Sequence, residues 1–559
     1  MRRVAGERKV LAEQFDLIVI GGGSAGCAMA GRLSEDGRYN VLLLEAGEKP
    51  DFRNKVPALT SAVVQNPAYD WCYQAEPDPS VGGRADVWPA GKRLGGGSSI
   101  NGMMFIRGHS WDYDNWARMG ATGWDYASVL PYFRRMESNE RGGDEWRGSD
   151  GPLSVSEGRA RYPITTAWID AAVEAGIRRS QDLNGARAEG VDYVQFSQRR
   201  GMRCSTATAY IDSARGRKTL SVETGAQVTR ILVEDGRAAG VEYVLHGQKK
   251  TVRARRGVVL SAGSMNSPRL LMLSGIGPAA HLQQLGIDVV LDLPGVGRNL
   301  QDHVGTHLVN EVNIPTLNSE ARGLAGLRHA MRFLFGRQGA LTTGIGHAQA
   351  FVKSRPGLPA PNIQLAFAAF AFDLDERGKL VLREKPAVST LIGLMRPRHR
   401  GQITLRSADP LAPPVIRHQL LGDDDDVEQI VEGFGIARDI MAQPAIAPFI
   451  LSEVRPGAAL GPEQLRDYVR MAGFTLYHPV GTCKIGQDEM AVVDPDLKLR
   501  GLDGLWVADA SVMPSLPSGN TNATAIMIGD KGAAHVLKAL GNAAMLPPAT
   551  DAAAISRAA

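Results

Sequence analysis

Residues 15–47 decide the fold, and they read FDLIVIGGGSAGCAMAGRLSEDGRYNVLLLEAG. An apolar run ends at three glycines, a pattern of small residues typical of a helix follows over residues 24–34, and a second apolar run leads to Glu45. This order predicts a strand, a phosphate-binding turn, a helix and a second strand. We therefore expect an α/β chain that begins with a Rossmann-like domain.

Three glycines of this stretch, Gly21, Gly23 and Gly26, match the G-x-G-x-x-G motif of dinucleotide-binding domains. The first permits the tight turn, the second lets a pyrophosphate approach the backbone, and the third allows helix and strand to pack closely. Free amide groups at the helix N-terminus favour the phosphates. Glu45 is placed to accept hydrogen bonds from a ribose, and its charge would repel a ribose phosphate. These residues favour FAD or NAD over NADP.

Composition excludes several classes of function. The chain has 559 residues, of which 44% are hydrophobic, enough for a large core and two domains. Lys and Arg number 63 against 59 for Asp and Glu, and this near balance argues against nucleic acid as a partner. The four cysteines lie far apart, without metal or redox spacing. Four aspartates at residues 423–426 precede a helical pattern and should complement its dipole, so no metal site is predicted.

The two ends of the chain carry no structural pattern. Residues 1–14 are charged and lack the apolar core of a secretory signal, so we expect a short disordered lead. Residues 546–559 are mostly small and polar and are expected to be disordered too. No run approaches the roughly 18 apolar residues of a membrane span. We therefore predict a cytoplasmic protein without a transmembrane segment.

The rest of the chain predicts a second glycine turn and a second domain. Residues 93–102 read RLGGGSSING, and strands with hairpin turns are expected at residues 234–236 and 246–247. Alternating stretches between about 310 and 475 predict an antiparallel sheet with helices on one face. We assign residues 15–160, 215–310 and 478–540 to a discontinuous FAD-binding domain, and residues 161–214 and 311–477 to an inserted α+β substrate-binding domain.

Four stretches, taken in order, resemble the glucose-methanol-choline (GMC) oxidoreductases, and the resemblance covers about residues 15–537. They are GGGSAGCAMAGRLSE with LLLEAG (residues 21–47), GKRLGGGSSINGMMFIRG (91–108), SAGSMNSPRLLMLSGIGP (261–278), and YHPVGTCKIG (477–486) with DASVMPSLPSGNTNATAIMIGDKGA (509–533). The resemblance implies bound FAD rather than NAD. It also implies oxidation of an alcohol by hydride transfer to the flavin.

His478 is the predicted general base. Oxidation of an alcohol carbon requires that the hydroxyl proton leave, and an imidazole titrates near neutrality. Members of the family pair this histidine with a second His or Asn, and the resemblance places that residue at Asn522. An amide takes up no proton at pH 7, so Asn522 should hold the alcohol oxygen by hydrogen bonding. The structural alternatives are a packed histidine and an asparagine in a turn.

The resemblance also implies which residues contact the cofactor. The second glycine turn would cover the isoalloxazine and ribityl chain, and Val228 and Ala262 would lie at the adenosine. The predicted cofactor-binding residues are Gly21, Gly23, Ser24, Ala25, Gly26, Glu45, Ala46, Arg93, Gly95, Ser99, Asn101, Gly102, Val228, Ala262, Asp509, Ala510, Asn520 and Thr521.

Two positions depart from choline-oxidising relatives. Choline oxidase-like members carry a histidine that bonds covalently to the flavin where this chain has Ile100, so we expect noncovalent FAD. Where choline-handling relatives tend to place a carboxylate, residues 344–351 read GIGHAQAF. A quaternary ammonium substrate therefore has no evident counter-charge there, although an aromatic cage would replace it.

The expected substrate is an aryl or apolar primary alcohol, oxidised to the aldehyde, with oxygen or a quinone-type electron acceptor. The predicted substrate pocket contains Met103, Tyr477 and His347, although a structural role for His347 is the commoner one. Other functions stay open at this point. The same fold serves flavin-dependent lyases and photodecarboxylases, which predict no flavin reduction by alcohols in the dark, and a choline-type dehydrogenase or a noncatalytic flavoprotein would share these motifs.

Overall fold

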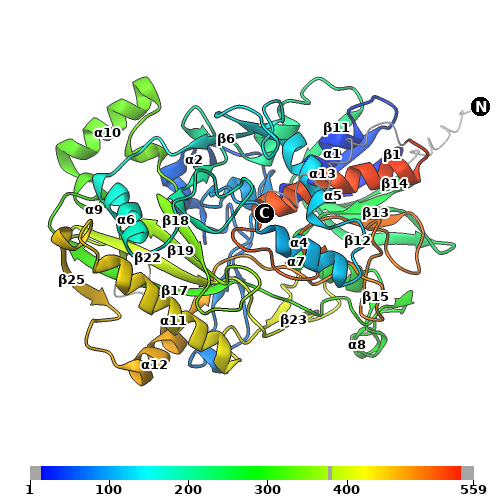
Figure 1. Ribbon diagram of the computed structural model, residues 1–559. Coiled ribbons are helices and arrows are strands. Elements are labelled where there is room, and N and C mark those ends of the chain that lie inside the picture. The colour runs from blue at the N-terminus through cyan, green and yellow to red at the C-terminus, as the bar shows by residue number, and fades with distance from the viewer. Residues whose placement is uncertain (1–13, 375–379, 543–559) are drawn as a thin grey trace, which may run out of the picture.

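A computed structural model describes residues 14–374 and 380–542. Apart from residue 14, the predicted lead and tail lie outside these residues. Within the described part of the chain, two seven-stranded sheets organise the molecule. Figure 1 shows one sheet on the right, beside the C-terminal helix α13 (Asn522–Ala539), and the other on the left.

The right-hand sheet has the strand order β11-β2-β1-β14-β13-β12, and β27 also pairs with β14. β11, β2, β1, β14 and β27 run parallel, whereas β12, β13 and β14 form antiparallel hairpins. Left-handed backbone at Asp235 and His246 makes the two hairpin turns that the sequence predicts. The strands are β1 (Gln14–Ile20), β2 (Val41–Glu45), β11 (Leu220–Thr224), β12 (Ala226–Glu234), β13 (Arg237–Leu245), β14 (Gln248–Leu260) and β27 (Leu505–Val507).

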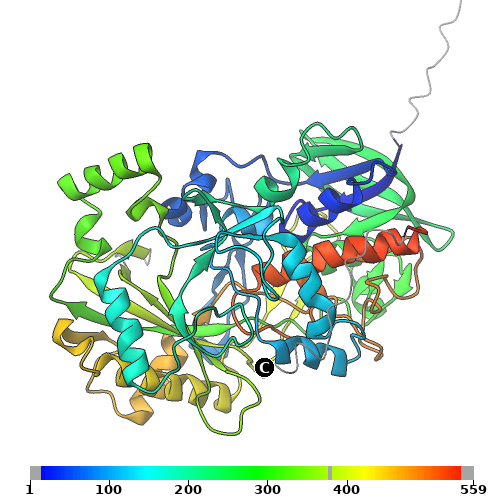
Figure 2. The same ribbon diagram turned by 45° about the horizontal axis from the view of Figure 1, so that its top comes forward.

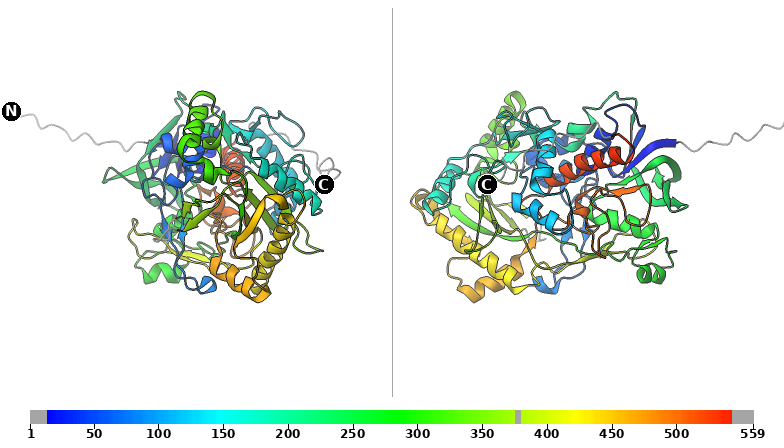
Figure 3. Two further views of the ribbon diagram at one scale, coloured as in Figure 1. Left: turned by 90° about the vertical axis from the view of Figure 1, so that its left-hand side faces the viewer. Right: turned by 45° about the vertical axis from the view of Figure 1, so that its right-hand side comes forward.

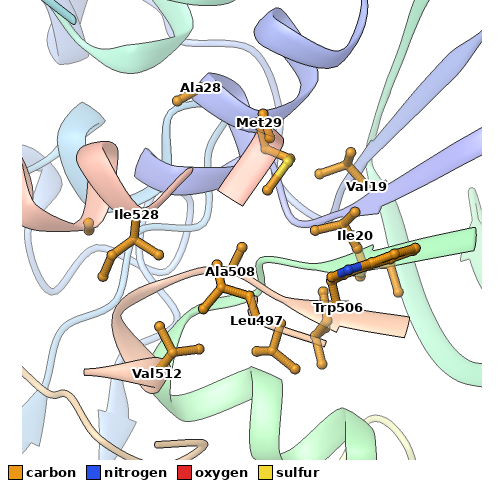
Figure 4. Close-up of a cluster of buried hydrophobic side chains, with 14 of the residues drawn as sticks. Val19, Ile20, Ala28, Met29, Leu497, Trp506, Ala508, Val512 and Ile528 are labelled. Carbon is orange, nitrogen blue, oxygen red and sulfur yellow. The ribbon is translucent and has the colours of Figure 1, made fainter. Parts of the chain in front are cut away.

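Two helices pack closely beside the glycine turn, α1 (Ser24–Leu33) and α13 (Asn522–Ala539). A Cβ at Gly529 would lie 2.3 Å from the Ala25 carbonyl oxygen, so only glycine permits this approach. Figure 4 shows the apolar side chains that fill the space between these helices and the sheet, including Met29, Trp506 and Ile528. The first turn of α1 is thereby held rigidly by the core.

The left-hand sheet is antiparallel throughout, with the order β25-β17-β22-β19-β18-β7 and β26 paired to β17. α6 and α11 pack on it, as Figures 1 and 2 show. Asp423 caps α11, so the four aspartates serve the helix start. The elements are α6 (Pro163–Glu174), β7 (Gly190–Tyr193), β17 (Val304–Val312), β18 (Ala348–Val352), β19 (Ile363–Ala368), β22 (Ala387–Leu394), α11 (Asp424–Met441), β25 (Ile450–Arg455) and β26 (Phe474–Thr475).

The two sheets do not divide the chain at all the predicted boundaries. β17 belongs to the second sheet from Val304 onward, although residues 304–310 were assigned to the FAD-binding domain. Conversely, residues 207–211 form a π-helical turn against α1, although they were assigned to the substrate-binding domain. An apolar strand carries no local sign of which sheet it will join, because that choice is made by tertiary packing.

The remaining helices and strands are short and mostly connect these layers. The helices are α2 (Phe52–Lys55), α3 (Thr60–Val63), α4 (Ser110–Arg118), α5 (Tyr126–Met136), α7 (Gly263–Leu273), α8 (Ala279–Gln284), α9 (Leu317–Glu320), α10 (Gly323–Gly336) and α12 (Pro462–Ala472). The strands are β3 (Tyr73–Gln74), β4 (Val87–Trp88), β5 (Glu137–Asn139), β6 (Leu153–Glu157), β8 (Gln195–Phe196), β9 (Gln198–Arg199), β10 (Met202–Arg203), β15 (Ile276–Gly277), β16 (Leu291–Asp292), β20 (Phe372–Leu374), β21 (Leu380–Leu382), β23 (Gln402–Thr404) and β24 (Val415–Arg417).

Candidate active site

A cavity of about 1780 Å³ is lined by residues from both halves of the molecule. From the first sheet it takes the glycine turn after β1, the end of β2 and residues 226–228. From the second it takes residues 306–307, and from the C-terminal motifs the loops around His478 and Asn520. The four motifs of the sequence therefore meet around one space.

The glycine turn has the geometry that a phosphate site needs. Gly21 has a φ of +92°, and a Cβ there would lie 2.5 Å from the Ser261 carbonyl oxygen. A Cβ at Gly26 would lie 1.8 Å from the Gly21 carbonyl oxygen, so this glycine lets helix and turn pack and does not line the cavity. Gly23, Ser24 and Ala25 do line it, where α1 begins with unpaired amide groups.

Glu45 lies at the end of β2 and lines the cavity together with Ala46. Its carboxyl accepts hydrogen bonds from the backbone N–H groups of Gly22 (2.8 Å) and Gly47 (2.6 Å). Burial raises the pKa of Glu45 to about 7. A carboxyl fixed in this way beside a helix N-terminus suits the ribose of a dinucleotide.

The second glycine turn packs directly on the first. A Cβ at Gly96 would lie 2.6 Å from the Cα of Gly23, so backbone meets backbone here. Gly96, Gly97, Asn101 and Gly102 line the cavity.

Three residues of this turn that were predicted to contact the cofactor, Arg93, Gly95 and Ser99, do not line the cavity. The Gly95 N–H donates to the Gly22 carbonyl (2.6 Å), and the Ser99 hydroxyl donates to the Leu94 carbonyl (2.7 Å). The Arg93 guanidinium stacks over the Tyr69 ring at 4.4 Å. All three hold the turn in shape, a role that a resemblance in sequence does not distinguish from contact.

The other end of the cavity is lined by Val228, Ala262, Asp509 and Ala510, four of the residues expected to contact the cofactor. Asp509 accepts hydrogen bonds from the Gly263 N–H (2.9 Å) and the Ser267 hydroxyl (2.6 Å), which fixes its carboxylate at the wall. Thr521 and Asn520 complete the lining beside the first turn of α13. A long cavity with a helix N-terminus, a ribose-type carboxyl and two glycine turns fits FAD.

His478 is held in place by Asp302, a fully buried residue just before β17. The His478 backbone N–H donates to the Asp302 carboxyl at 2.8 Å, and the Thr475 hydroxyl donates to its second oxygen. Burial raises the pKa of Asp302 to about 7. The loop that carries the predicted base is thus tied to the second sheet.

Hydrogen bonds decide which nitrogen of His478 carries a proton. His303 is fully buried, and its Nε2 lies 3.1 Å from the Met395 carbonyl, which only accepts, so Nε2 is protonated. Burial lowers the pKa of His303 well below its usual value, so its Nδ1 is a bare acceptor. His478 Nδ1 lies 2.9 Å from that atom and must donate. Burial also lowers the pKa of His478 to about 4, so its Nε2 is unprotonated at neutral pH.

Asn520, and not Asn522, is the neighbour of this unprotonated nitrogen. Asn520 Nδ2 lies 3.2 Å from His478 Nε2 and donates to it, and Asn520 Oδ1 has no partner among the described residues. Asn522 begins α13, and its side-chain oxygen accepts from the Ser24 hydroxyl at 2.7 Å. The expected pairing with Asn522 is therefore corrected: two asparagines lie two residues apart, and the turn at Gly519 presents the first to His478.

Two of the three predicted pocket residues, Met103 and Tyr477, line the cavity, whereas His347 does not. His347 is buried with its ring edge-on to Tyr162 at 5.1 Å and to Phe370 at 5.8 Å. Its Nδ1 accepts from the Ala369 N–H at 3.1 Å. Burial lowers the pKa of His347 to about 3. It is a core histidine directly before β18, packed against Tyr162 and Phe370.

Sequence reasoning missed three residues that shape the site: Asp302, His303 and His307. His307 lines the cavity and stacks on Phe474 at 5.2 Å. The available signal was an Asp-His pair directly before an apolar strand, which is unusual because charged residues are seldom buried without a task.

Residues 15–305 and 397–529 match the N-terminal and C-terminal domains of the GMC oxidoreductases. The chain belongs to this family. It is an FAD-dependent oxidoreductase that acts on alcohol CH–OH groups.

Relatives in sequence include an oxygen-dependent choline dehydrogenase of Brucella canis, 42% identical over 94% of this chain and 96% of the relative. The mitochondrial choline dehydrogenase of Homo sapiens is 41% identical, over 94% and 90% of the two chains. Among solved structures, pyridoxine 4-oxidase from Mesorbium loti has a TM-score of 0.84 at 30% identity, covering 93% of this chain and 98% of that one.

Proposed function

We propose that this GMC oxidoreductase oxidises an uncharged primary alcohol with an apolar or aryl body to the aldehyde. The observation that carries the proposal is the pair of His478 and Asn520, which both line the cavity, with the unprotonated Nε2 of His478 accepting from the Asn520 amide. FAD, when bound, supplies the hydride acceptor. The residues of the chain supply a base, a hydrogen bond to the hydroxyl oxygen and an apolar lining of the cavity.

The alcohol hydroxyl takes the place of the Asn520 N–H at His478 Nε2, which then accepts the hydroxyl proton. Once protonated, the imidazolium keeps its Nδ1 hydrogen bond to His303, which accepts without itself changing protonation. The Asn520 amide lies within reach of the same oxygen and steadies the charge that develops on it. Asn520 therefore takes over the role first assigned to Asn522.

Apolar side chains favour an uncharged substrate. Met103, Met104, Ile345, Leu476 and Tyr477 line the cavity that His478 also lines. Their sulfur, aliphatic and ring surfaces suit an aryl or alkyl body. Pyridoxine, which the structurally similar oxidase is named for, is an aryl alcohol of this kind.

Choline is the second candidate, because the relatives in sequence are named choline dehydrogenases. Among the described residues, the carboxylates that line the cavity are Glu45, Asp373 and Asp509. Glu45 and Asp509 lie in the cofactor cradle, and Asp373 is paired with Arg383 (2.9 Å) and Arg455 (3.4 Å). A trimethylammonium group would therefore depend on the aromatic rings that line the cavity, which are those of Trp71, Phe372, Tyr468, Phe474 and Tyr477.

The deciding experiment is anaerobic reduction of the enzyme-bound flavin, followed by its visible absorbance. Benzyl and pyridine-ring alcohols should bleach it in the dark, and choline should do so at least about tenfold more slowly. Choline as the fastest substrate would replace our proposal with the second candidate. No bleaching by any alcohol would favour the lyase or photodecarboxylase functions.

We also propose that FAD is held noncovalently. Ile100 lines the cavity at the position where covalent relatives carry a histidine, and it packs with Val63 and Tyr69. Acid or heat denaturation should therefore release all of the flavin into the supernatant. Flavin that stays with the precipitated polypeptide would contradict this proposal.

Readmission of air after bleaching tests the electron acceptor. Rapid return of the flavin colour in air would indicate oxygen, and slow return would indicate a quinone-type acceptor.

A further inference from the structure

Helix α10 presents an apolar stripe to solvent. Leu324, Leu327, Met331, Leu334 and Phe335 are 86%, 59%, 46%, 63% and 83% exposed. Because they recur at three- and four-residue intervals, they share one side of the helix. Folded proteins seldom leave such a run of large apolar side chains uncovered.

The opposite side of α10 fixes the helix to the protein. His329 and Phe333 are buried there, and the Arg337 guanidinium stacks over the Phe333 ring at 4.8 Å. His329 Nε2 lies 3.1 Å from a Glu320 carboxylate oxygen, which anchors the helix to α9. Figures 1 and 2 show α10 standing out at one edge of the molecule, and Figure 3 shows it from two further sides. The outward direction of the stripe is therefore set by the fold.

Basic side chains lie along one edge of the stripe, and no acid interrupts it. Arg328 and Arg332 each follow a stripe residue by one position, about 100° around the helix. Arg328 lies 3.9 Å from Glu320, and Arg332 has no ion pair among the described residues. The sequence of α10, GLAGLRHAMRFLFG, contains neither Asp nor Glu. An apolar stripe edged by arginines is complementary to an anionic lipid surface.

We propose that α10 docks the protein on an anionic membrane surface, with the stripe among the acyl chains and Arg328 and Arg332 at the lipid phosphates. A second copy of the chain is a poorer occupant. Pairing two stripes would bring the arginines of both helices together with no carboxylate on either helix to offset them. No helix among the described residues is long and apolar enough to cross a membrane, so this contact is with the surface.

The docking helix leads directly to the cavity. The chain runs from Gly336 through residues 340–342 to Ile345, which is half exposed and lines the cavity. A docked protein would hold this segment near the bilayer. That arrangement suits delivery of an apolar alcohol or a quinone-type acceptor dissolved in the lipid, a consequence that rests on the proposed function, whereas the docking itself does not.

Flotation of the FAD-loaded enzyme with vesicles tests the docking. Wild type should float with phosphatidylcholine vesicles that contain phosphatidylglycerol, and less with phosphatidylcholine alone. The stripe variant L327Q/M331Q/F335Q should lose at least about tenfold in affinity. R328Q/R332Q should lose most of the preference for phosphatidylglycerol. L411Q is the control, because Leu411 is 58% exposed and lies between β23 and β24, and Figure 1 shows β23 well apart from α10. It should float like wild type.

Three results would overturn the proposal. They are no flotation of wild type at low salt, equal flotation of the stripe variant, and a concentration-dependent dimer that only the stripe variant lacks, which would make a second copy the occupant. Flavin content and the rate with a water-soluble alcohol should be unchanged in every variant, which shows that each is folded. If no alcohol is oxidised while flotation behaves as expected, the proposed function fails and the docking stands.

Discussion

The two ends of the cavity are built in different ways. Around the cofactor cradle, backbone meets backbone: Gly96 lies against Gly23, and Gly26 against the Gly21 carbonyl. Around His478 the site consists of side chains that come from two other segments of the chain, Asp302 and His303 from one and Asn520 from the other. Local sequence rules describe the first kind of site well, because a tight backbone approach demands glycine. They describe the second kind poorly, because its geometry depends on long-range packing.

The largest effect should come from placing a side chain in the backbone end. In Gly26→Ala the new Cβ would lie 1.8 Å from the Gly21 carbonyl oxygen, so α1 must move away from the phosphate turn. We expect purified protein with less than about a tenth of the wild-type flavin per chain, since overpacking shifts backbone. The flavin-to-protein absorbance ratio measures this.

Gly435→Ala is the matched control, because Gly435 also lies within a helix, α11, and its Cβ would meet nothing within 4 Å. This substitution should keep full flavin and raise the free energy of unfolding by up to about 1 kcal/mol. Full flavin in Gly26→Ala would show that the cradle is more yielding than its contacts indicate.

The next effect belongs to the side-chain end. His478→Ala removes the base but no part of the cradle, so flavin content should stay at the wild-type level. The rate of anaerobic flavin reduction by the best alcohol should fall by about 10²–10⁴-fold. Stopped-flow absorbance measures the rate, and free imidazole should restore part of it. An unchanged rate would remove His478 from the mechanism.

The sequence predicted the glycine-rich end of the cavity well and the end around His478 less well. β1, α1 and β2 end within a residue or two of their expected limits. The reason is local, because the tight turn at Gly21 ends β1 and Glu45 ends β2. The pairing of His478 went to the wrong asparagine, since Asn520 and Asn522 have the same chemistry and only the turn at Gly519, with a φ of +106°, separates their directions. His303 escaped notice because its role depends on Met395, 92 residues away.

Substituting the two asparagines one at a time tests which of them holds the alcohol oxygen. Asn520→Ala should slow flavin reduction by about 10²-fold, because the alcohol oxygen loses a hydrogen-bond donor at the moment charge develops. Asn522→Ala breaks only the bond to Ser24 at the start of α13, so the rate should stay within about threefold of wild type. The comparison uses the same stopped-flow assay. The reverse order of effects would restore Asn522 to the role first predicted for it.

The smallest effect concerns pH. The base works only when unprotonated, so its rate is lost as pH falls through its pKa, and burial lowers the pKa of His478 to about 4. Flavin reduction should therefore vary less than about twofold between pH 6 and 9, with an acid limb well below the pKa of about 6.5 of a free histidine.

In His303→Ala, water can enter the space left beside His478 and relieve the burial that lowers its pKa. The acid limb should then move upward toward that ordinary value. A wild-type limb near neutral pH would mean that the bound cofactor or substrate, rather than burial, sets the proton affinity of this histidine.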